Sequence, residues 1–386
     1  MGANQITRLH EDYVEELKSK GAIQSPRVEE AFRSVPRHLF LPEVPLERVY
    51  RDEAILTKRQ DGQLVSSSSQ PAMMAIMLEQ LDLQSGHRVL EIGAGTGYNA
   101  GLMAHIVGDS GQVTTIDIDE DLVEGARNRL SVAGLDAVTV VCRDGGLGYP
   151  GNAPYDRIIL TVAAWDIAPA WREQLKPGGR LLLPLEVGRS VQKSVAFDKI
   201  GDQLESASVK DCGFMPLRGD FARPLEYIPL GPDPGLVVSV DDPTKVDGEV
   251  VYRLLSGPSE YAPTGIYATP GEVMFGGLAL WLSLHEPGFC VLSAEDQMAD
   301  RGIVAGLMEL SGEWRRCWTN GLLGDDGLCV FARPPDGYSA SEQPVGFAGF
   351  ELFVRGYGSW SDHAERLIQQ VRRWEAVGAR PTTGSA

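Results

Sequence analysis

The stretch "VLEIGAGTGYNAG", residues 89–101, decides the fold that this sequence predicts. A short apolar run, typical of a buried strand, leads into three glycines at Gly93, Gly95 and Gly97, and a helical apolar pattern follows. A strand that turns through glycines into a helix is typical of α/β proteins in which the backbone approaches a ligand closely. A tight strand–helix turn without a ligand has the same local pattern, so the flanking sequence must decide between the two.

The alternation of strands and helices continues on the C-terminal side of the glycines. Residues 120–133 have the spacing of an amphipathic helix, and further strands are expected at residues 112–117, 137–142, 155–162 and 180–185. Strands separated by helices of this length predict a parallel, doubly wound sheet. The expected fold class is therefore α/β, with a Rossmann-like sheet, an N-terminal helical segment and a C-terminal α+β domain.

Acidic residues at the strand ends indicate which ligand the glycine turn binds. Asp117 ends the next strand, where a carboxylate would hold a ribose hydroxyl. The dinucleotide fingerprint is not met, because its third glycine would fall at Tyr98. Glu91 is expected at the mouth of the turn, where its carboxylate would repel a pyrophosphate but suit a cation.

S-adenosylmethionine matches this pattern, since it has a sulfonium, an ammonium and a ribose but no phosphate. Asp144 and Gly145 follow the next strand, where they could bind an adenine amino group, although such a pair alone also fits an ordinary turn. Ligands of open α/β sheets bind at the carboxyl ends of the strands. The sequence therefore predicts an S-adenosylmethionine site, with S-adenosylhomocysteine as product, formed by Glu91, Gly93, Gly95, Gly97, Asp117, Asp144 and Gly145.

Composition limits the partners of this protein. Its 386 residues carry a net charge of −18, which disfavours binding to nucleic acid and suits a basic peptide, although solubility alone also explains it. The five cysteines form no C-x-x-C pair, so we expect reduced thiols, a cytoplasmic location and no metal site. No apolar run approaches the ~18 residues that cross a membrane.

The sequence predicts that the chain has five consecutive parts. Residues 1–80 read as an N-terminal helical segment with a substrate loop, and residues 81–225 as the S-adenosylmethionine-binding domain. The Pro-rich residues 226–243 read as a linker, residues 244–378 as an α+β domain expected to recognise the peptide substrate, and residues 379–386 as a disordered tail. Within the α+β domain, "GEVMFGGLALWLSL" predicts one helix and "SDHAERLIQQVRRWEAV" another.

Residues 28–217 resemble the protein-L-isoaspartate O-methyltransferase family, whose members have the class I S-adenosylmethionine-dependent fold. The resemblance rests on "RVEEAFRSVPRHLFLPE", "SSSSQPAMMAIMLEQLDL", "VLEIGAGTGYNAGLMAHIV", "RDGGLGYPGNAPYDRIILTVAA", "LKPGGRLLLPL" and "FMPL", in the family order. The family methylates the side-chain carboxylate of isoaspartyl residues in damaged proteins. The resemblance therefore implies a carboxyl O-methyltransferase.

The same resemblance assigns residues to the acceptor side. Ser69 falls on the serine of the family's T-I-S-Q-P segment and Ser67 on its threonine, while Ser66 and Ser68 match no functional position. Gln192 falls on a glutamine of a substrate loop. Thr161 falls on a threonine or asparagine near the acceptor, although it equally fits a buried strand hydroxyl. Four serines without this match would be typical of a solvated linker.

The chain continues for about 170 residues beyond the end of the resemblance. Such extended homologues resemble methyltransferases of gene clusters for ribosomally made peptides, such as lanthipeptides and graspetides, including the FxLD-system type. This favours an acceptor aspartate in a modified precursor peptide, whose methyl ester would close to an aspartimide and could open to isoaspartate. The alternatives are a repair enzyme with an accessory domain and a binding protein that has lost activity.

Overall fold

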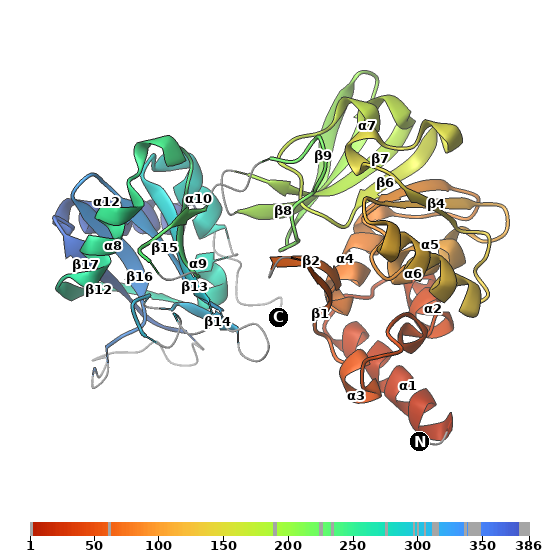
Figure 1. Ribbon diagram of the computed structural model, residues 1–386, viewed down its shortest axis with the longest axis horizontal. Helices are drawn as coiled ribbons and strands as arrows, with labels where there is room; N and C mark the ends of the chain where they lie inside the picture. Colours follow the sequence, from red (N-terminus) through yellow and green to blue (C-terminus); the bar gives the residue numbers. More distant parts are fainter. Residues whose placement is uncertain are drawn as a thin grey trace. The chain divides into compact units, whose positions relative to one another are not determined.

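The glycine turn follows an interior strand of a seven-stranded sheet (Figure 1). The strand order is β5-β4-β3-β6-β7-β8-β9. The strands are β3 (Arg88–Ile92), β4 (Gln112–Asp117), β5 (Thr139–Cys142), β6 (Tyr155–Leu160), β7 (Leu175–Glu186), β8 (Gln192–Ile200) and β9 (Gln203–Asp211). β3 to β7 pair in parallel, whereas β7, β8 and β9 pair antiparallel. The expected parallel sheet is therefore present and is extended by an antiparallel hairpin.

Alternate residues of β3 enter two different cores, as the period of two in a strand requires. Val89 packs with helices on one face, whereas Leu90 packs with Trp171 on the other. The helices of the first face include α4 (Pro71–Leu81), α5 (Tyr98–Val107) and α6 (Glu120–Val132). Trp171 belongs to α7 (Pro169–Gln174). The sheet is thus covered on both faces, which leaves the carboxyl ends of its parallel strands as the place for a ligand.

The N-terminal segment is less helical than the sequence predicted. It contains α1 (Ala3–Ser19), α2 (Pro26–Ser34) and α3 (Leu46–Val49), with Ser25 capping α2 as expected. Residues between α3 and α4, however, form an antiparallel hairpin of β1 (Ile55–Gln60) and β2 (Gln63–Ser68). Three of the four serines therefore lie in a strand rather than in a loop, because cross-strand pairing satisfies their backbone groups.

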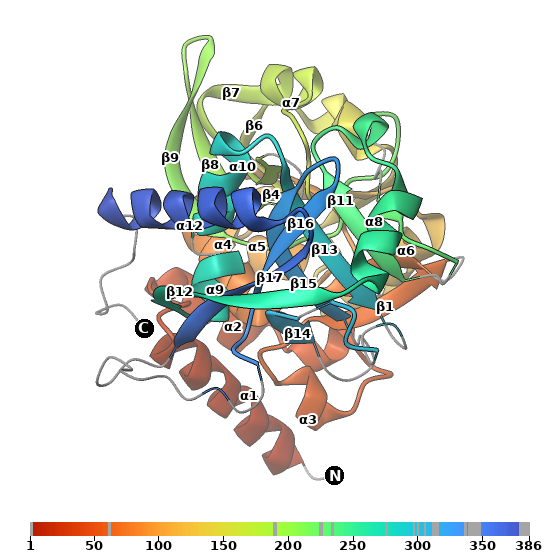
Figure 2. The same ribbon diagram turned by 90° about the vertical axis from the view of Figure 1, so that its left-hand side faces the viewer.

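A second sheet, whose strands pair antiparallel, is built from the C-terminal part of the chain. Its order is β10-β11-β13-β15-β16-β17-β12, and β14 also pairs with β15. The strands are β10 (Ile228–Pro229), β11 (Leu236–Val240), β12 (Ser259–Ala268), β13 (Phe289–Glu295), β14 (Met308–Leu310), β15 (Arg316–Leu323), β16 (Gly327–Ala332) and β17 (Phe350–Gly358). The helix α12 (Ser361–Ala376) crosses one face of this sheet (Figure 2). Its side chains Leu367, Val371 and Trp374 are buried.

Two expectations for this region are wrong. The Pro-rich linker expected at residues 226–243 contains β10 and β11, whose apolar side chains lie in a core with α8 (Gly248–Ser256). The single helix expected around residues 271–284 is two helices, α9 (Pro270–Met274) and α10 (Leu278–His285). Gly277 precedes α10 with a φ of 92°, a left-handed conformation that a continuous helix excludes.

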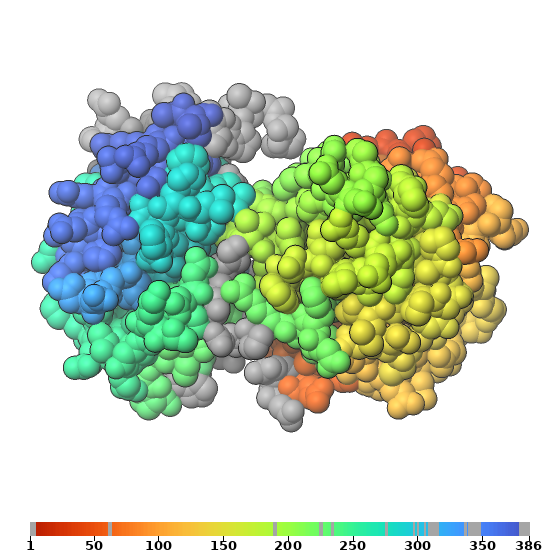
Figure 3. All heavy atoms as spheres, turned by 90° about the horizontal axis from the view of Figure 1, so that it is seen from above, coloured from red at the N-terminus to blue at the C-terminus, as the bar shows by residue number. Residues whose placement is uncertain are grey.

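The structure describes residues 3–60, 63–187, 191–223, 227–232, 235–274, 277–295, 298, 301–304, 306–310, 316–335, 338 and 349–377. The chain splits into unit 1, residues 1–186 with 192–223, and unit 2, residues 187–191 with 224–386. Figure 3 shows the packed atoms of both units. The tail expected at residues 379–386 lies outside the described residues.

Candidate cofactor and acceptor site

The glycine turn needs glycine at each of its three positions. Gly93, Gly95 and Gly97 have φ values of 105°, 51° and 87°, in the region that side chains disfavour. A Cβ on Gly93 would lie 2.5 Å from Thr161 Oγ1, and one on Gly97 would lie 3.3 Å from Ala126 of α6. At Gly95, in contrast, the nearest atom to such a Cβ is Ser67 O at 3.7 Å, an ordinary van der Waals contact.

Asp117 lies at the carboxyl end of β4, beside the glycine turn. Its Oδ2 accepts a hydrogen bond of 3.0 Å from the backbone N–H of Gly95, and its Oδ1 accepts one of 3.3 Å from Asp119. Burial raises the pKa of this carboxyl above its usual value, while the two backbone N–H groups oppose the shift. The structure therefore brings together the carboxylate and the turn that the sequence assigned to one ligand.

Glu91 does not lie at the mouth of the turn, where the sequence placed it. Its side chain is fully buried, and its oxygens accept hydrogen bonds from Thr115 Oγ1 at 2.6 Å and Asn99 Nδ2 at 2.8 Å. Burial raises the pKa of this carboxyl to about 7, an effect that both hydrogen bonds oppose. Glu91 thus joins β3 to β4 and to the first turn of α5, and its role toward a ligand stays a prediction.

Asp144 and Gly145 are held in a defined turn after β5. Asp144 caps a short 3-10 helix by accepting a 2.8 Å bond from Gly146 N–H, and it also accepts a 2.6 Å bond from Asp220 N–H. A Cβ on Gly145 would lie 2.3 Å from Ile92 Cγ2, so this position requires glycine. The apolar side chains of Ile118 and Leu147, which follow the ends of β4 and β5, are exposed.

The serine run presents its hydroxyls to two sides, as a strand requires. Ser66 and Ser68 are buried, and their Oγ atoms bond Thr57 Oγ1 at 2.9 Å and Arg37 Nη2 at 3.3 Å, respectively. Ser67 and Ser69 are partly exposed, and among the described residues no partner is found for their hydroxyls. The two serines assigned to the acceptor are therefore those left available to a ligand.

Arg37 is a structural support of this segment that the sequence did not single out. Its buried guanidinium donates to the carbonyls of Val49 and Ser69, at 2.9 Å and 3.0 Å, as well as to the Ser68 hydroxyl. Among the described residues no carboxylate pairs with it. The family segment "SVPRHLF" contained the residue, but only the tertiary structure shows that it fixes the position of Ser69.

Thr161 and Gln192 contact backbone in the structure. Thr161 is partly exposed and follows β6, and its Oγ1 donates to Gly93 O at 2.7 Å, so it contacts the glycine turn while its role toward the acceptor stays a prediction. Gln192 forms a reciprocal pair with Phe214, donating to its carbonyl at 3.1 Å and accepting from its N–H at 2.7 Å. Gln192 therefore holds the "FMPL" segment, and a contact of its amide with substrate stays a prediction.

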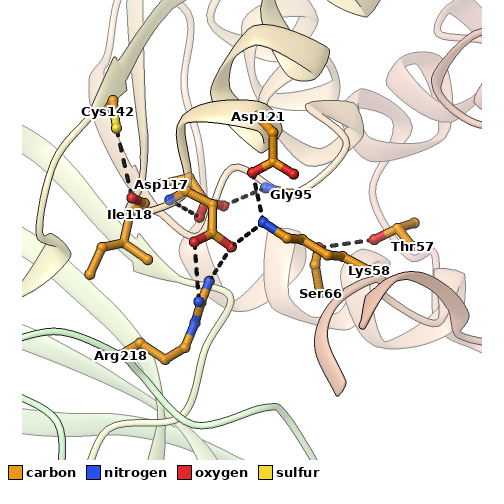
Figure 4. Close-up of polar contacts among 10 residues, drawn as sticks. Thr57, Lys58, Ser66, Gly95, Asp117, Ile118, Asp121, Cys142 and Arg218 are labelled. Carbon is orange, nitrogen blue, oxygen red and sulfur yellow. Dashed lines mark hydrogen bonds and ion pairs between the residues drawn. The ribbon is translucent and has the colours of Figure 1, made fainter. Parts of the chain in front are cut away.

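Four further charged residues converge next to Asp117 without any sequence signal. Asp119 and Asp121 follow β4, and they pair with Lys58 of β1 and, for Asp119, with Arg218 (Figure 4). Among the described residues no group of three His, Cys, Asp or Glu side chains is arranged to hold a metal ion. No helix in the described part of the chain is long and apolar enough to cross a membrane.

Comparison with known proteins identifies the family. The family model described as protein-L-isoaspartate(D-aspartate) O-methyltransferase matches residues 8–221. A protein-L-isoaspartate O-methyltransferase of Methanopyrus kandleri is 43% identical over 215 residues, which cover 55% of this chain and 92% of the relative. The Thermotoga maritima protein of the same name is 37% identical over 212 residues, covering 54% of this chain but only 66% of the relative.

A solved structure of a protein-L-isoaspartate O-methyltransferase matches far more of the chain. It covers 96% of this chain and 93% of its own, with a TM-score of 0.52 and 25% identity. The similarity thus extends beyond the catalytic sheet into unit 2. This chain belongs to the protein-L-isoaspartate O-methyltransferase family, and it is an S-adenosylmethionine-dependent carboxyl O-methyltransferase.

Proposed function

We propose that this protein transfers a methyl group from S-adenosylmethionine to the carboxylate of isoaspartyl residues in proteins or peptides. The observation that carries the proposal is the approach of the serine segment to the glycine turn. Ser67 O lies 3.7 Å from the position that a Cβ would take on Gly95. The segment assigned to the acceptor is therefore next to the turn assigned to the methyl donor.

The reaction requires that the acceptor carboxylate and the methyl donor be held in line, and it requires no proton transfer. A carboxylate with a pKa near 4 is ionised at neutral pH, so the acceptor needs no general base. The bound cofactor supplies an electrophilic methyl on a sulfonium. Under this proposal Asp117 and Gly95 hold the donor, while Ser67 and Ser69 offer hydroxyls to the acceptor and orient its oxygen toward the methyl.

The extension of the chain fits isoaspartyl substrates. The sequence favoured a tailoring enzyme because an ordinary repair enzyme would end near Leu217. The solved isoaspartate methyltransferase that matches 96% of this chain weakens that reason, because a protein of this name has a comparable extent. Isoaspartyl substrates are therefore our main proposal, and unit 2 would contribute to choosing among them.

A second candidate is an aspartate of a ribosomally made precursor peptide. It is favoured by Ser68, a buried polar residue bound to Arg37 at the position where the family segment has isoleucine. This difference points to an acceptor segment with altered chemistry. The product would then be an aspartyl methyl ester that closes to an aspartimide.

The two candidates are separated by matched peptides. We expect the full chain to methylate a peptide containing isoaspartate and to leave the same sequence with aspartate unmodified, as followed by a mass increase of about 14 Da per methyl group. A short peptide encoded by a neighbouring gene, in its cyclised form, is the third substrate. Preference for that peptide over the isoaspartyl one would contradict the main proposal. Its aspartimide would weigh about 18 Da less than the unmodified peptide, because the following backbone amide attacks the methyl ester and methanol leaves.

A further inference from the structure

Two segments outside the parallel strands lie over the residues assigned to the cofactor. The hairpin of β1 and β2 approaches Gly95 through Ser66 and Ser67. Residues 212–223 approach the next strand end, where Asp220 N–H donates to Asp144 Oδ2 at 2.6 Å. Both segments therefore contact the strand ends to which the cofactor is assigned.

One carboxylate joins both segments. Asp119 Oδ2 lies 3.0 Å from Lys58 Nζ of the hairpin and 2.7 Å from Arg218 Nη2 of the other segment. A second Arg218 nitrogen, Nη1, lies 3.2 Å from Asp119 Oδ1, so this contact is bidentate. Figure 4 draws Lys58 and Arg218 with their contacts to this carboxylate, and it labels Asp117 and Gly95 in the same close-up.

The surroundings of Asp119 make this junction stronger than an ordinary surface ion pair. The side chains of Asp119, Lys58 and Arg218 are 16%, 21% and 33% exposed, so solvent screens them only in part. Bidentate arginine–carboxylate pairs are among the strong hydrogen-bonded contacts of proteins. The Arg218 guanidinium, followed by the Lys58 ammonium, holds the pKa of the Asp119 carboxyl below its usual value against the effect of burial.

Local structure does not otherwise require this carboxylate. Asp119 is the N-cap residue of α6, but its side chain makes no capping hydrogen bond. Its backbone N–H donates to Asp117 Oδ1, a contact that an asparagine would keep. Its neighbour Asp121 is 63% exposed and contacts only Lys58 among these cations.

We propose that Asp119 is a positioning residue that fastens the β1–β2 hairpin and residues 212–223 over the bound cofactor, and so limits the rate at which the cofactor and its product leave. This proposal rests on the assignment of S-adenosylmethionine to the Asp117–Gly95 end of the sheet. Lys58 and Arg218 act on the ligand through Asp119.

The test is the dissociation rate of S-adenosylhomocysteine from the full chain, measured by displacement in a stopped-flow instrument. Asp119→Asn removes the charge with little change of shape, and we expect dissociation about tenfold faster, the change that loss of one charge-assisted hydrogen bond produces. In the wild type we expect dissociation to accelerate with salt, because ions screen the cluster. This salt dependence should be much weaker in Asp119→Asn.

Asp121→Asn is the matched control, since it removes one carboxylate from the same helix turn and leaves Asp119 paired with Arg218. We expect its dissociation rate to stay within about twofold of the wild type, as for a solvent-exposed ion pair. Lys58→Gln and Arg218→Gln should each give a partial acceleration, and the double variant should reach the rate of Asp119→Asn. The melting temperature of each variant identifies any general loss of folding, which a purely structural role would cause.

Equal dissociation rates and equal salt dependence in the wild type and Asp119→Asn would overturn this proposal. Equal effects of Asp119→Asn and Asp121→Asn would overturn it as well, because the junction would then have no special role. The proposed acceptor is tested separately by the matched peptides. An aspartyl preference there would change the proposed function without altering these dissociation rates.

Discussion

At the scale of single residues, Asp117 and Gly95 carry the cofactor assignment. Asp117→Ala removes a partly buried carboxylate that would accept ribose hydroxyls, and we expect at least tenfold weaker S-adenosylmethionine binding, about the effect of a hydrogen bond to a charged group. Gly95→Val should weaken binding too, because valine disfavours the φ of 51° at this position. Calorimetry measures both variants. Near-normal affinity in both would contradict the assigned site.

The serine run offers a comparison between neighbouring hydroxyls. Ser69→Ala should lower turnover, by roughly fivefold for loss of one neutral hydrogen bond, and leave cofactor affinity within about threefold. Ser66→Ala removes the bond to Thr57 and should instead lower the free energy of unfolding by about 1 kcal/mol, with turnover nearly unchanged. Steady-state kinetics and urea unfolding measure the two effects. Equal turnover losses would show that the acceptor assignment within the run is wrong.

The raised pKa of Glu91 predicts that the stability of the protein falls as pH rises toward 7. Burial raises its pKa from 4.5 to about 7, so the folded protein binds more protons than the unfolded chain between these values. Stability due to this group is therefore present at low pH and lost as pH rises toward 7. Glu91→Gln can keep contacts with Thr115 and Asn99, and should raise stability at pH 8 by up to about 3 kcal/mol relative to pH 5.

Urea unfolding at both pH values measures this difference. If Glu91→Gln changes stability equally at pH 5 and pH 8, the burial of an ionised carboxylate is not the cause. A loss of cofactor affinity in the same variant would independently support the predicted role of Glu91 toward a cationic ligand.

At the scale of elements, Gln192 at the start of β8 holds the segment that contains Phe214 and Arg218. Gln192→Ala leaves both the N–H and the carbonyl of Phe214 without this partner, and we expect a loss of about 1–2 kcal/mol of local stability. Hydrogen exchange of the amides around residues 212–217 measures it. Gln192→Glu is the control, because it retains an acceptor for the Phe214 N–H but no donor for the carbonyl. Unchanged exchange in Gln192→Ala would mean that the segment is held by other contacts, such as the Ala163–Leu217 hydrogen bond.

At the scale of the whole molecule, the unit boundary defines a truncation. Leu230 is fully buried in the core of unit 2. A chain ending at Leu230 would therefore keep β10 but lose its partner strand β11. Residues 1–223 contain all the assigned cofactor residues and the complete seven-stranded sheet. We expect this truncated chain to bind S-adenosylmethionine and to discriminate less among peptide substrates than the full chain.

Circular dichroism is the first control of the truncation, because Val191 normally packs in unit 2 and would be exposed. Methyl transfer is then compared on several isoaspartyl peptides of different flanking sequence. An identical order of substrates for the truncated and full chains would exclude substrate selection by unit 2.

The sequence by itself determined the features that depend on neighbouring residues in the chain. Strand and helix periodicity around residues 89–101 predicted the central sheet, and the glycine turn with Asp117 predicted the ligand class. These predictions succeed because a turn and the strands beside it are fixed by local conformational preferences. The expected linker at residues 226–243 failed for the opposite reason, since proline content does not reveal which apolar residues find strand partners elsewhere.

Only the tertiary structure decided which distant side chains meet. Lys58 and Arg218 lie 61 and 99 residues from Asp119 in the sequence, yet both bind its carboxylate. Arg37 donates a hydrogen bond to Ser68, which is 31 residues away in the sequence. Glu91 is buried, whereas the sequence alone predicted that it would lie at the mouth of the glycine turn. Charge pairing and burial depend on the separation of atoms in space, and the folding of the hairpin and of residues 212–223 onto the sheet sets that separation.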